Sequence, residues 1–220
     1  MPAKPIPTVA VDGENPDEGV IQRAARLLRR GAVIVCPTET FYGLAADASN
    51  REACERICIL KCRPEDKALP SIVSDLEQLE IVALAITPQA RVLARRFWPG
   101  PLTLVVTAKL PLAAAAGDGS LAVRASGLAL PRLLARELGR PITATSANRS
   151  GSPPKTTAAE AASDLVSTVD LVLDAGPSPG GLPSTVVDVR EALPKLVREG
   201  RIPFEIILDA LRVPPFLDFA

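Results

Sequence analysis

The segment DEGVIQRAARLLRRGAVIVC, residues 17–36, joins an amphipathic pattern to a continuous apolar run and predicts a helix followed by a buried strand. Within residues 17–30 the apolar side chains recur at helical spacing, with acids first and arginines last, as the helix dipole favours. Gly31 is expected to end the helix. The apolar run Ala32–Cys36 has the length of a buried strand. A helix that feeds directly into such a strand predicts a fold in which helices pack on a sheet.

The same alternation of patterns continues along the rest of the chain. Residues 1–16 read as an extended lead-in. We expect further helices at 50–61, 88–97, 128–138, 157–165 and 203–212, and further strands at 102–107, 120–124, 142–145, 171–173, 185–189 and 196–198. Interleaved helices and strands predict an α/β or α+β fold with a mixed sheet flanked by helices. No repeat or low-complexity linker divides the chain, so we expect one domain, residues 1–220.

The composition is that of a folded protein, with 47% hydrophobic and 23% charged residues. Aromatic residues make up only 3%, so the core must be aliphatic. The formal net charge is zero, and any binding of an anion or of RNA must therefore come from a local cluster of cations. The start resembles no signal peptide and no apolar run reaches membrane-spanning length, so we expect no membrane span and a cytoplasmic location.

The chain has four cysteines and no histidine. Cys54, Cys58 and Cys62 are spaced to share one face of a helix. A metal site could use that face, but the close spacing of zinc ligands is absent, so packing is the favoured interpretation and no metal site is predicted. Without histidine there is neither a Ser-His-Asp triad nor a base to activate Cys36. Both common nucleotide-binding glycine motifs are also missing.

Polar residues gather where predicted strands and helices end. The segment 37–44 follows a buried strand and is either a site or an ordinary turn capped by threonine hydroxyls. Lys61, Arg63 and Lys67 form a cluster of cations that either binds a polyphosphate or only interacts with the dipole of the preceding helix. Arg124 at a strand end can hold a carboxylate by two parallel bonds. The loop 143–151 offers many small donors, and residues 180–185 and 198–200 flank two more strands. Chemistry here must rest on positioning and on neutralising charge.

Seven of these segments together resemble the YrdC-like family, the threonylcarbamoyl-AMP synthases, over about residues 20–205. In chain order they are PTETFYGLAADA (37–48), KCRPEDKAL (61–69), FWPGPLTLVV (97–106), SLAVRAS (120–126), GRPITATSANRSG (139–151), STVVDV (184–189) and VREG (197–200).

The resemblance implies a twisted mixed sheet flanked by helices, with the site in a positively charged hollow. It implies an enzyme that combines L-threonine, bicarbonate and ATP into threonylcarbamoyl-AMP and pyrophosphate, with Mg²⁺ accompanying the triphosphate. A partner enzyme then transfers the threonylcarbamoyl group to tRNA. The residues implied for L-threonine are Thr40, Arg124, Ala144 and Ser184. Those implied for ATP are Lys61, Arg63, Lys67, Ser120, Ser146, Asn148, Pro154 and Arg198, with Lys61 and Arg63 also implied in catalysis.

Three positions depart from the family pattern. Cys62 replaces the usual glycine between the lysine and the arginine, and Ser126 replaces the usual proline after Arg124. Pro154 stands where a serine often meets the nucleotide, so only its backbone can serve. Two alternatives remain at this point: a paralogue that acts on another carbamoyl acceptor, and an RNA-binding module without catalysis. Zero net charge argues against strong RNA affinity. Carbamoyl-transfer enzymes that contain this domain carry cysteine-rich zinc segments, which this chain lacks.

Overall fold

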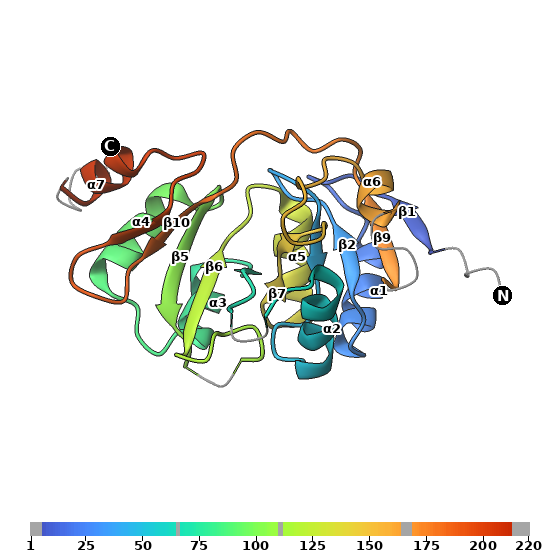
Figure 1. The fold of residues 1–220 in the computed structure, drawn as a ribbon, viewed down its shortest axis with the longest axis horizontal. Coiled ribbons are helices and arrows are strands. Elements are labelled where there is room, and N and C mark those ends of the chain that lie inside the picture. Colours follow the sequence, from blue (N-terminus) through green and yellow to red (C-terminus); the bar gives the residue numbers. More distant parts are fainter. Residues whose placement is uncertain (1–5, 65–66, 110–111, 164–168, 213–220) are drawn as a thin grey trace.

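The computed structural model describes residues 6–64, 67–109, 112–163 and 169–212 (Figure 1). Within these residues the helices are α1 (Glu18–Arg29), α2 (Arg51–Lys61), α3 (Leu76–Val82), α4 (Pro88–Phe97), α5 (Ala129–Leu138), α6 (Ala158–Ser163) and α7 (Phe204–Arg212). The strands are β1 (Thr8–Ala10), β2 (Ile34–Cys36), β3 (Gly43–Ala45), β4 (Ser71–Ile72), β5 (Leu102–Thr107), β6 (Ser120–Arg124), β7 (Ile142–Thr143), β8 (Thr145–Ser146), β9 (Leu171–Asp174), β10 (Thr185–Asp188) and β11 (Lys195–Arg198).

These strands form two mixed sheets, which confirms the predicted fold class. The first has the order β1-β9-β2-β3-β8 and the second the order β11-β10-β5-β6-β4-β7. The two sheets occupy opposite halves of the view in Figure 1, with β2 and β9 in one half and β5, β6 and β10 in the other. The chain passes from the second sheet to the first at Ala144, which separates β7 from β8.

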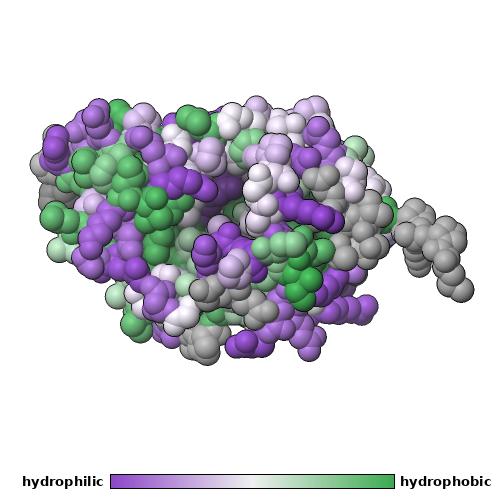
Figure 2. Space-filling model, in the orientation of Figure 1, coloured by the Kyte–Doolittle hydropathy of each residue, from purple (hydrophilic) through white to green (hydrophobic). Residues whose placement is uncertain are grey.

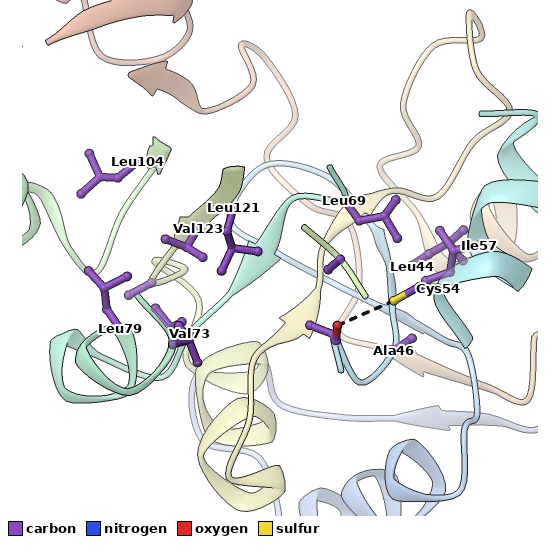
Figure 3. Packing of buried hydrophobic residues seen from close by; sticks show 14 of the residues in the cluster. Leu44, Ala46, Cys54, Ile57, Leu69, Val73, Leu79, Leu104, Leu121 and Val123 are labelled. Atoms are coloured by element: carbon purple, nitrogen blue, oxygen red, sulfur yellow. Dashed lines mark hydrogen bonds between the residues drawn. The ribbon is translucent and has the colours of Figure 1, made fainter. Parts of the chain in front are cut away.

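Strand β2 is buried on both faces, as its apolar run predicts. Ile34 and Cys36 pack in a cluster with residues of α1 and α5, whereas Val35 packs in the larger cluster that includes α2. Alternate side chains of a strand point to opposite faces, so helices cover the first sheet on both sides. Figure 3 shows the larger cluster, in which Leu44 of β3 lies beside Ile57 of α2.

The second sheet has one apolar face and one polar face along its central strands. The buried core contains Leu102, Leu104, Val106, Leu121, Val123 and Val187 from β5, β6 and β10. The intervening residues of β6 are Ser120, Ala122 and Arg124, which the period of a strand directs to the opposite face. This face, which we call the polar face of the second sheet, is the part of the fold that carries the site.

Helix α2 has the predicted bounds, but Cys62, the residue after it, differs from the prediction. The Asn50 side chain accepts a hydrogen bond from Ala53 N and caps the helix. At the other end Cys62 takes the left-handed conformation, with φ 51°, and is exposed. Cys54 and Cys58 are buried, so the packing interpretation holds for them and is wrong for Cys62. The left-handed turn takes Cys62 off the helical face that Cys54 and Cys58 share.

Several elements escaped the sequence analysis. The strands β1, β3 and β4 have two or three residues each, too few for a periodic pattern. Helix α3 did leave a signal in the sequence, which is the capping pair Asp75 and Gln78 three residues apart. In the structure Asp75 accepts from Gln78 N, and the Gln78 side chain accepts from Ser74 N. The expected strand 142–145 is divided between the two sheets. Residues 164–165 of the expected helix 157–165 lie outside the described residues.

Across the described ranges, no helix has the length and hydropathy to cross a membrane.

Candidate active site

A cavity of about 1120 Å³ opens above the polar face of the second sheet. Its floor is formed by Thr103, Val105, Ser120, Ala122, Arg124, Ser184 and Val186. Its walls come from the segment after β2, from the end of α2 and from the loop after β8. The surface is hollowed near the centre of Figure 2, and hydrophilic residues are visible inside the hollow.

All twelve residues that the sequence singled out line this one cavity. They are Thr40, Lys61, Arg63, Lys67, Ser120, Arg124, Ala144, Ser146, Asn148, Pro154, Ser184 and Arg198. They come from segments up to 158 residues apart, from Thr40 to Arg198. The fold therefore brings together every candidate, and the role of each remains a prediction.

Arg124 ends β6 on the floor of the cavity and is 7% exposed. Its Nη1 donates to Glu39 Oε1, and the Ser126 hydroxyl donates to Glu39 Oε2. Burial lowers the pKa of Arg124, and the charge of Glu39 opposes that effect. A guanidinium pKa lies far above neutral pH, so this side chain stays a cation and can bind a carboxylate.

Ser184 and Arg198 also line the cavity, and they contact each other. Arg198 Nη2 donates to Ser184 O at 2.8 Å, and the hydroxyls of Ser184 and Thr103 are 2.9 Å apart. Burial and the neighbouring charge of Arg124 lower the pKa of Arg198. Two guanidinium groups thus act on the same part of the cavity, which favours an anionic ligand between them.

Lys61 is the last residue of α2 and is only 3% exposed. Its ammonium donates to the main-chain carbonyls of Ser146 and Asn148, and to Asn148 Oδ1 at 3.2 Å. Burial, with a smaller contribution from the charge of Arg63, lowers the pKa of Lys61 to about 8. The side chain therefore bonds to the loop after β8 rather than merely lying near the carbonyls that end its own helix.

Arg63 lies two residues further on and faces the same cavity. Its Nη2 donates to Ala68 O at 2.7 Å, whereas its Nε is buried and has no hydrogen-bond partner within the described chain. An unpaired buried donor costs roughly 1–3 kcal/mol. Arg63 is held by Ala68 O and keeps its positive charge at the cavity, which fits an anion binding beside it.

The loop after β8 closes the cavity with small and polar residues. Asn148 Nδ2 donates to the carbonyls of Arg149 and Ser152, which fixes the side chain against its own loop. Ala144 offers a methyl group between the two sheets, and Ala144 N donates to Pro70 O. Gly43 permits the close approach of β3 to this segment, since a Cβ there would lie 3.2 Å from Thr145 O. Pro154 is exposed at the rim.

The cavity is strongly cationic although the whole chain has no net charge. Five of its lining residues are lysine or arginine, and Asp118 is the one carboxylate among them. Such an arrangement can bind a polyphosphate and a carboxylate together and can stabilise negative charge that develops between them. Cys36 offers no nucleophile here, because burial raises its pKa to about 12.

Sequence reasoning overlooked three polar residues at the site. Thr38 accepts from Thr40 N, and its hydroxyl lies 3.1 Å from that of Thr40. Thr103 lies on the floor beside Ser184, and Glu39 lies behind Arg124. Alternation along residues 102–107 could have identified Thr103, because it is a polar residue in an apolar strand. Glu39 could not be identified in that way, since its partners are 85 and 87 residues away.

A protein-family model, Sua5/YciO/YrdC, described as telomere recombination, matches residues 26–200 of the chain. A curated relative from Pyrococcus abyssi, named threonylcarbamoyl-AMP synthase, is 39% identical over 207 residues, or 92% of this chain and 61% of that protein. A Bacillus subtilis protein of the same name is 40% identical over 190 residues, or 85% of this chain and 55% of that protein. The chain thus spans less than two thirds of the length of these relatives.

A crystal structure of P. abyssi Sua5 complexed with L-threonine has the same fold. Its TM-score is 0.86 at 38% sequence identity, and the alignment covers 94% of this chain and 61% of the other. The matched region of the family model contains all twelve cavity residues named above.

Proposed function

Since the chain belongs to the Sua5/YciO/YrdC family, we propose that it is a threonylcarbamoyl-AMP synthase, which forms L-threonylcarbamoyladenylate and pyrophosphate from L-threonine, bicarbonate and ATP. The observation that carries this proposal is the convergence of the twelve candidate residues on one cavity. The names of the relatives and the L-threonine complex of the P. abyssi protein also support it.

The amino-acid end of the cavity would lie at Arg124, Ser184 and Thr40. The guanidinium of Arg124 would bind the α-carboxylate, which a planar fork recognises by two parallel bonds. The hydroxyls of Thr40 and Ser184 would bind other polar groups of L-threonine, and Ala144 would contact its methyl group. Each of these side chains is already held by neighbours, so binding orders little new structure.

The nucleotide end would lie at Lys61, Arg63 and Lys67. These cations would bind the triphosphate, with Arg198 supplying a further positive charge. The remaining ATP contacts would come from Ser120, Ser146, Asn148 and the backbone of Pro154. The donor set fits a Mg²⁺ ion that arrives with the triphosphate, because proteins hold such ions through substrate phosphates and one or two carboxylates. Asp118 is the carboxylate that lines the cavity. When bound, that ion would neutralise phosphate charge.

The proposed reaction has two steps. The amino nitrogen of L-threonine first forms a bond to the carbon of bicarbonate, which releases water and gives a carbamate. A carbamate oxygen then attacks the α-phosphorus of ATP, and the bond to pyrophosphate breaks. Lys61 and Arg63 would stabilise the charge that grows on the phosphate oxygens, with no histidine required.

The product would serve a separate transferase that modifies tRNA, in the cytoplasm. We expect this chain to bind RNA weakly at most, because its net charge is zero and a cluster of its cations lies inside a cavity.

Pyrophosphate release tests the proposal. A synthase releases pyrophosphate from ATP only when both L-threonine and bicarbonate are present. A paralogue that acts on another carbamoyl acceptor would release it without dependence on L-threonine, and an RNA-binding module would release none. Either of the last two results overturns the proposal.

A further inference from the structure

We propose that Glu39 is a positioning residue that orients the guanidinium of Arg124 toward the carboxylate of the amino-acid substrate. This inference rests on the proposed function of the cavity and adds to it a residue outside the cavity lining. Glu39 does not line the cavity, whereas Thr38, Thr40 and Arg124 do. It must therefore act on the substrate through Arg124.

Contacts from several sides fix the Glu39 carboxylate. Oε1 accepts from Arg124 Nη1, and Oε2 accepts from the Ser126 hydroxyl. Ser126 is fully buried, so water does not compete with its hydroxyl for the Glu39 carboxylate. Gly127 provides the space, because a Cβ at that position would lie 3.2 Å from Glu39 Cγ and 3.3 Å from Glu39 Cβ. The carboxylate is thus a rigid acceptor in a fixed place.

One guanidinium nitrogen of Arg124 is committed to Glu39, and the others are available. In the described chain, Glu39 is the one hydrogen-bond partner of the Arg124 side chain. Among the described residues, the buried side-chain nitrogens without a hydrogen-bond partner are Nε of Arg63 and Nε of Arg132. None of them belongs to Arg124, so its unpaired nitrogens are not sealed inside the protein. The unpartnered nitrogens of Arg124 therefore retain access to the cavity that this residue lines.

The planar geometry of the guanidinium turns this single contact into an orientation. Fixing Nη1 on a rigid acceptor fixes the plane and rotation of the fork, since its N–H groups share one rigid plane. The free edge is then presented to the cavity before any substrate arrives. An arginine held in this way loses less conformational freedom on binding a carboxylate than an unrestrained one would.

A double-mutant cycle in the full chain separates orientation from simple structural support. In the wild-type background, Glu39→Gln and Glu39→Ala should weaken L-threonine binding in calorimetry, the alanine variant by about tenfold or more. Glutamine retains an acceptor of the same shape, so its loss should be the smaller. ATP affinity should stay within about twofold, because the nucleotide cations are held by other residues.

The second background is Arg124→Lys, which keeps a cation but has no fork to orient. There, Glu39→Gln should change L-threonine affinity by less than about twofold. Glu80→Gln serves as a matched control, because Glu80 pairs with Arg91 on the surface away from the cavity. This variant should bind L-threonine like the wild type.

Each outcome decides a different question. Unchanged L-threonine affinity in both Glu39 variants overturns the inference while the proposed function stands. An equal loss of affinity in the wild-type and Arg124→Lys backgrounds also overturns it, since Glu39 would then act independently of the fork. A wild-type protein that binds ATP but no L-threonine overturns the proposed function, and the inference falls with it.

Discussion

The ammonium of Lys61 donates a hydrogen bond to the main-chain carbonyl of Asn148 at 2.8 Å and ties the end of α2 to the loop after β8. In return, Ser150 N donates to Lys61 O at 3.0 Å. These reciprocal contacts join two segments that are far apart in the sequence and that both line the cavity. A helix-dipole role alone does not require such contacts, so Lys61 is best understood as part of the site.

The first prediction concerns the catalytic contribution of Lys61 and Arg63. Replacing either by alanine should lower the rate of pyrophosphate release about a hundred- to a thousandfold, the usual value of a group that stabilises transition-state charge. The melting temperature should fall by only several degrees, because the lost hydrogen bonds cost roughly 1–3 kcal/mol. Arg63→Lys should be intermediate, since it keeps the charge and loses the fork. Wild-type turnover in both alanine variants would refute the assignment.

The second prediction concerns pH. The folded pKa of Lys61, about 8, lies below the ordinary value of 10.5. The cation is therefore present below about pH 8 and is lost as pH rises through that value, so kcat/KM for ATP should decline there. By linkage, the unfolded chain binds more protons between those two values, and the contribution of Lys61 to stability rises with pH across that window.

The matched variant for this titration is Lys61→Arg. An arginine keeps its charge throughout the range, so the decline in kcat/KM should move to higher pH whatever the absolute rate. A decline that stays at the same pH in the arginine variant would assign it to another group.

The third prediction concerns Arg124. Arg124→Ala should weaken L-threonine binding roughly ten- to a hundredfold, the effect of losing a charged hydrogen bond worth on the order of 1.5–3 kcal/mol. ATP binding should stay nearly intact. Calorimetry with each substrate measures both affinities, and an unchanged L-threonine affinity would show that the carboxylate binds elsewhere.

The sequence predicted the long elements and twelve residues that line one cavity, for different reasons. Helices such as α1 and strands such as β5 carry their own periodic pattern. The twelve site residues were reached through seven ordered motifs, not through local chemistry, which left the interpretation of Lys61 and Arg63 open. What the sequence could not show is pairing between distant segments. In the sequence Glu39 is one polar residue of a turn-prone segment, and the fold shows that it pairs with Arg124.

Cys62 illustrates a conformation that the sequence concealed. Its left-handed backbone, at φ 51°, suits glycine better than any residue with a Cβ. Cys62→Gly should therefore raise the free energy of unfolding by on the order of 1 kcal/mol. Cys62→Ser is the control, because it keeps the Cβ and should give no gain. Urea unfolding of the three proteins measures the difference, and equal midpoints would contradict the conformational argument.

The central claim is that this cavity joins L-threonine, bicarbonate and ATP into one product. The most direct measurement incubates the protein with ATP, L-threonine and carbon-labelled bicarbonate and then separates the nucleotides by chromatography with mass detection. We expect an adenylate that carries the label and the mass of L-threonylcarbamoyl-AMP, formed by the wild type and almost absent with Arg63→Ala. Hydrolysis of ATP without a labelled adenylate, in protein shown to be folded and to bind ATP, would contradict it.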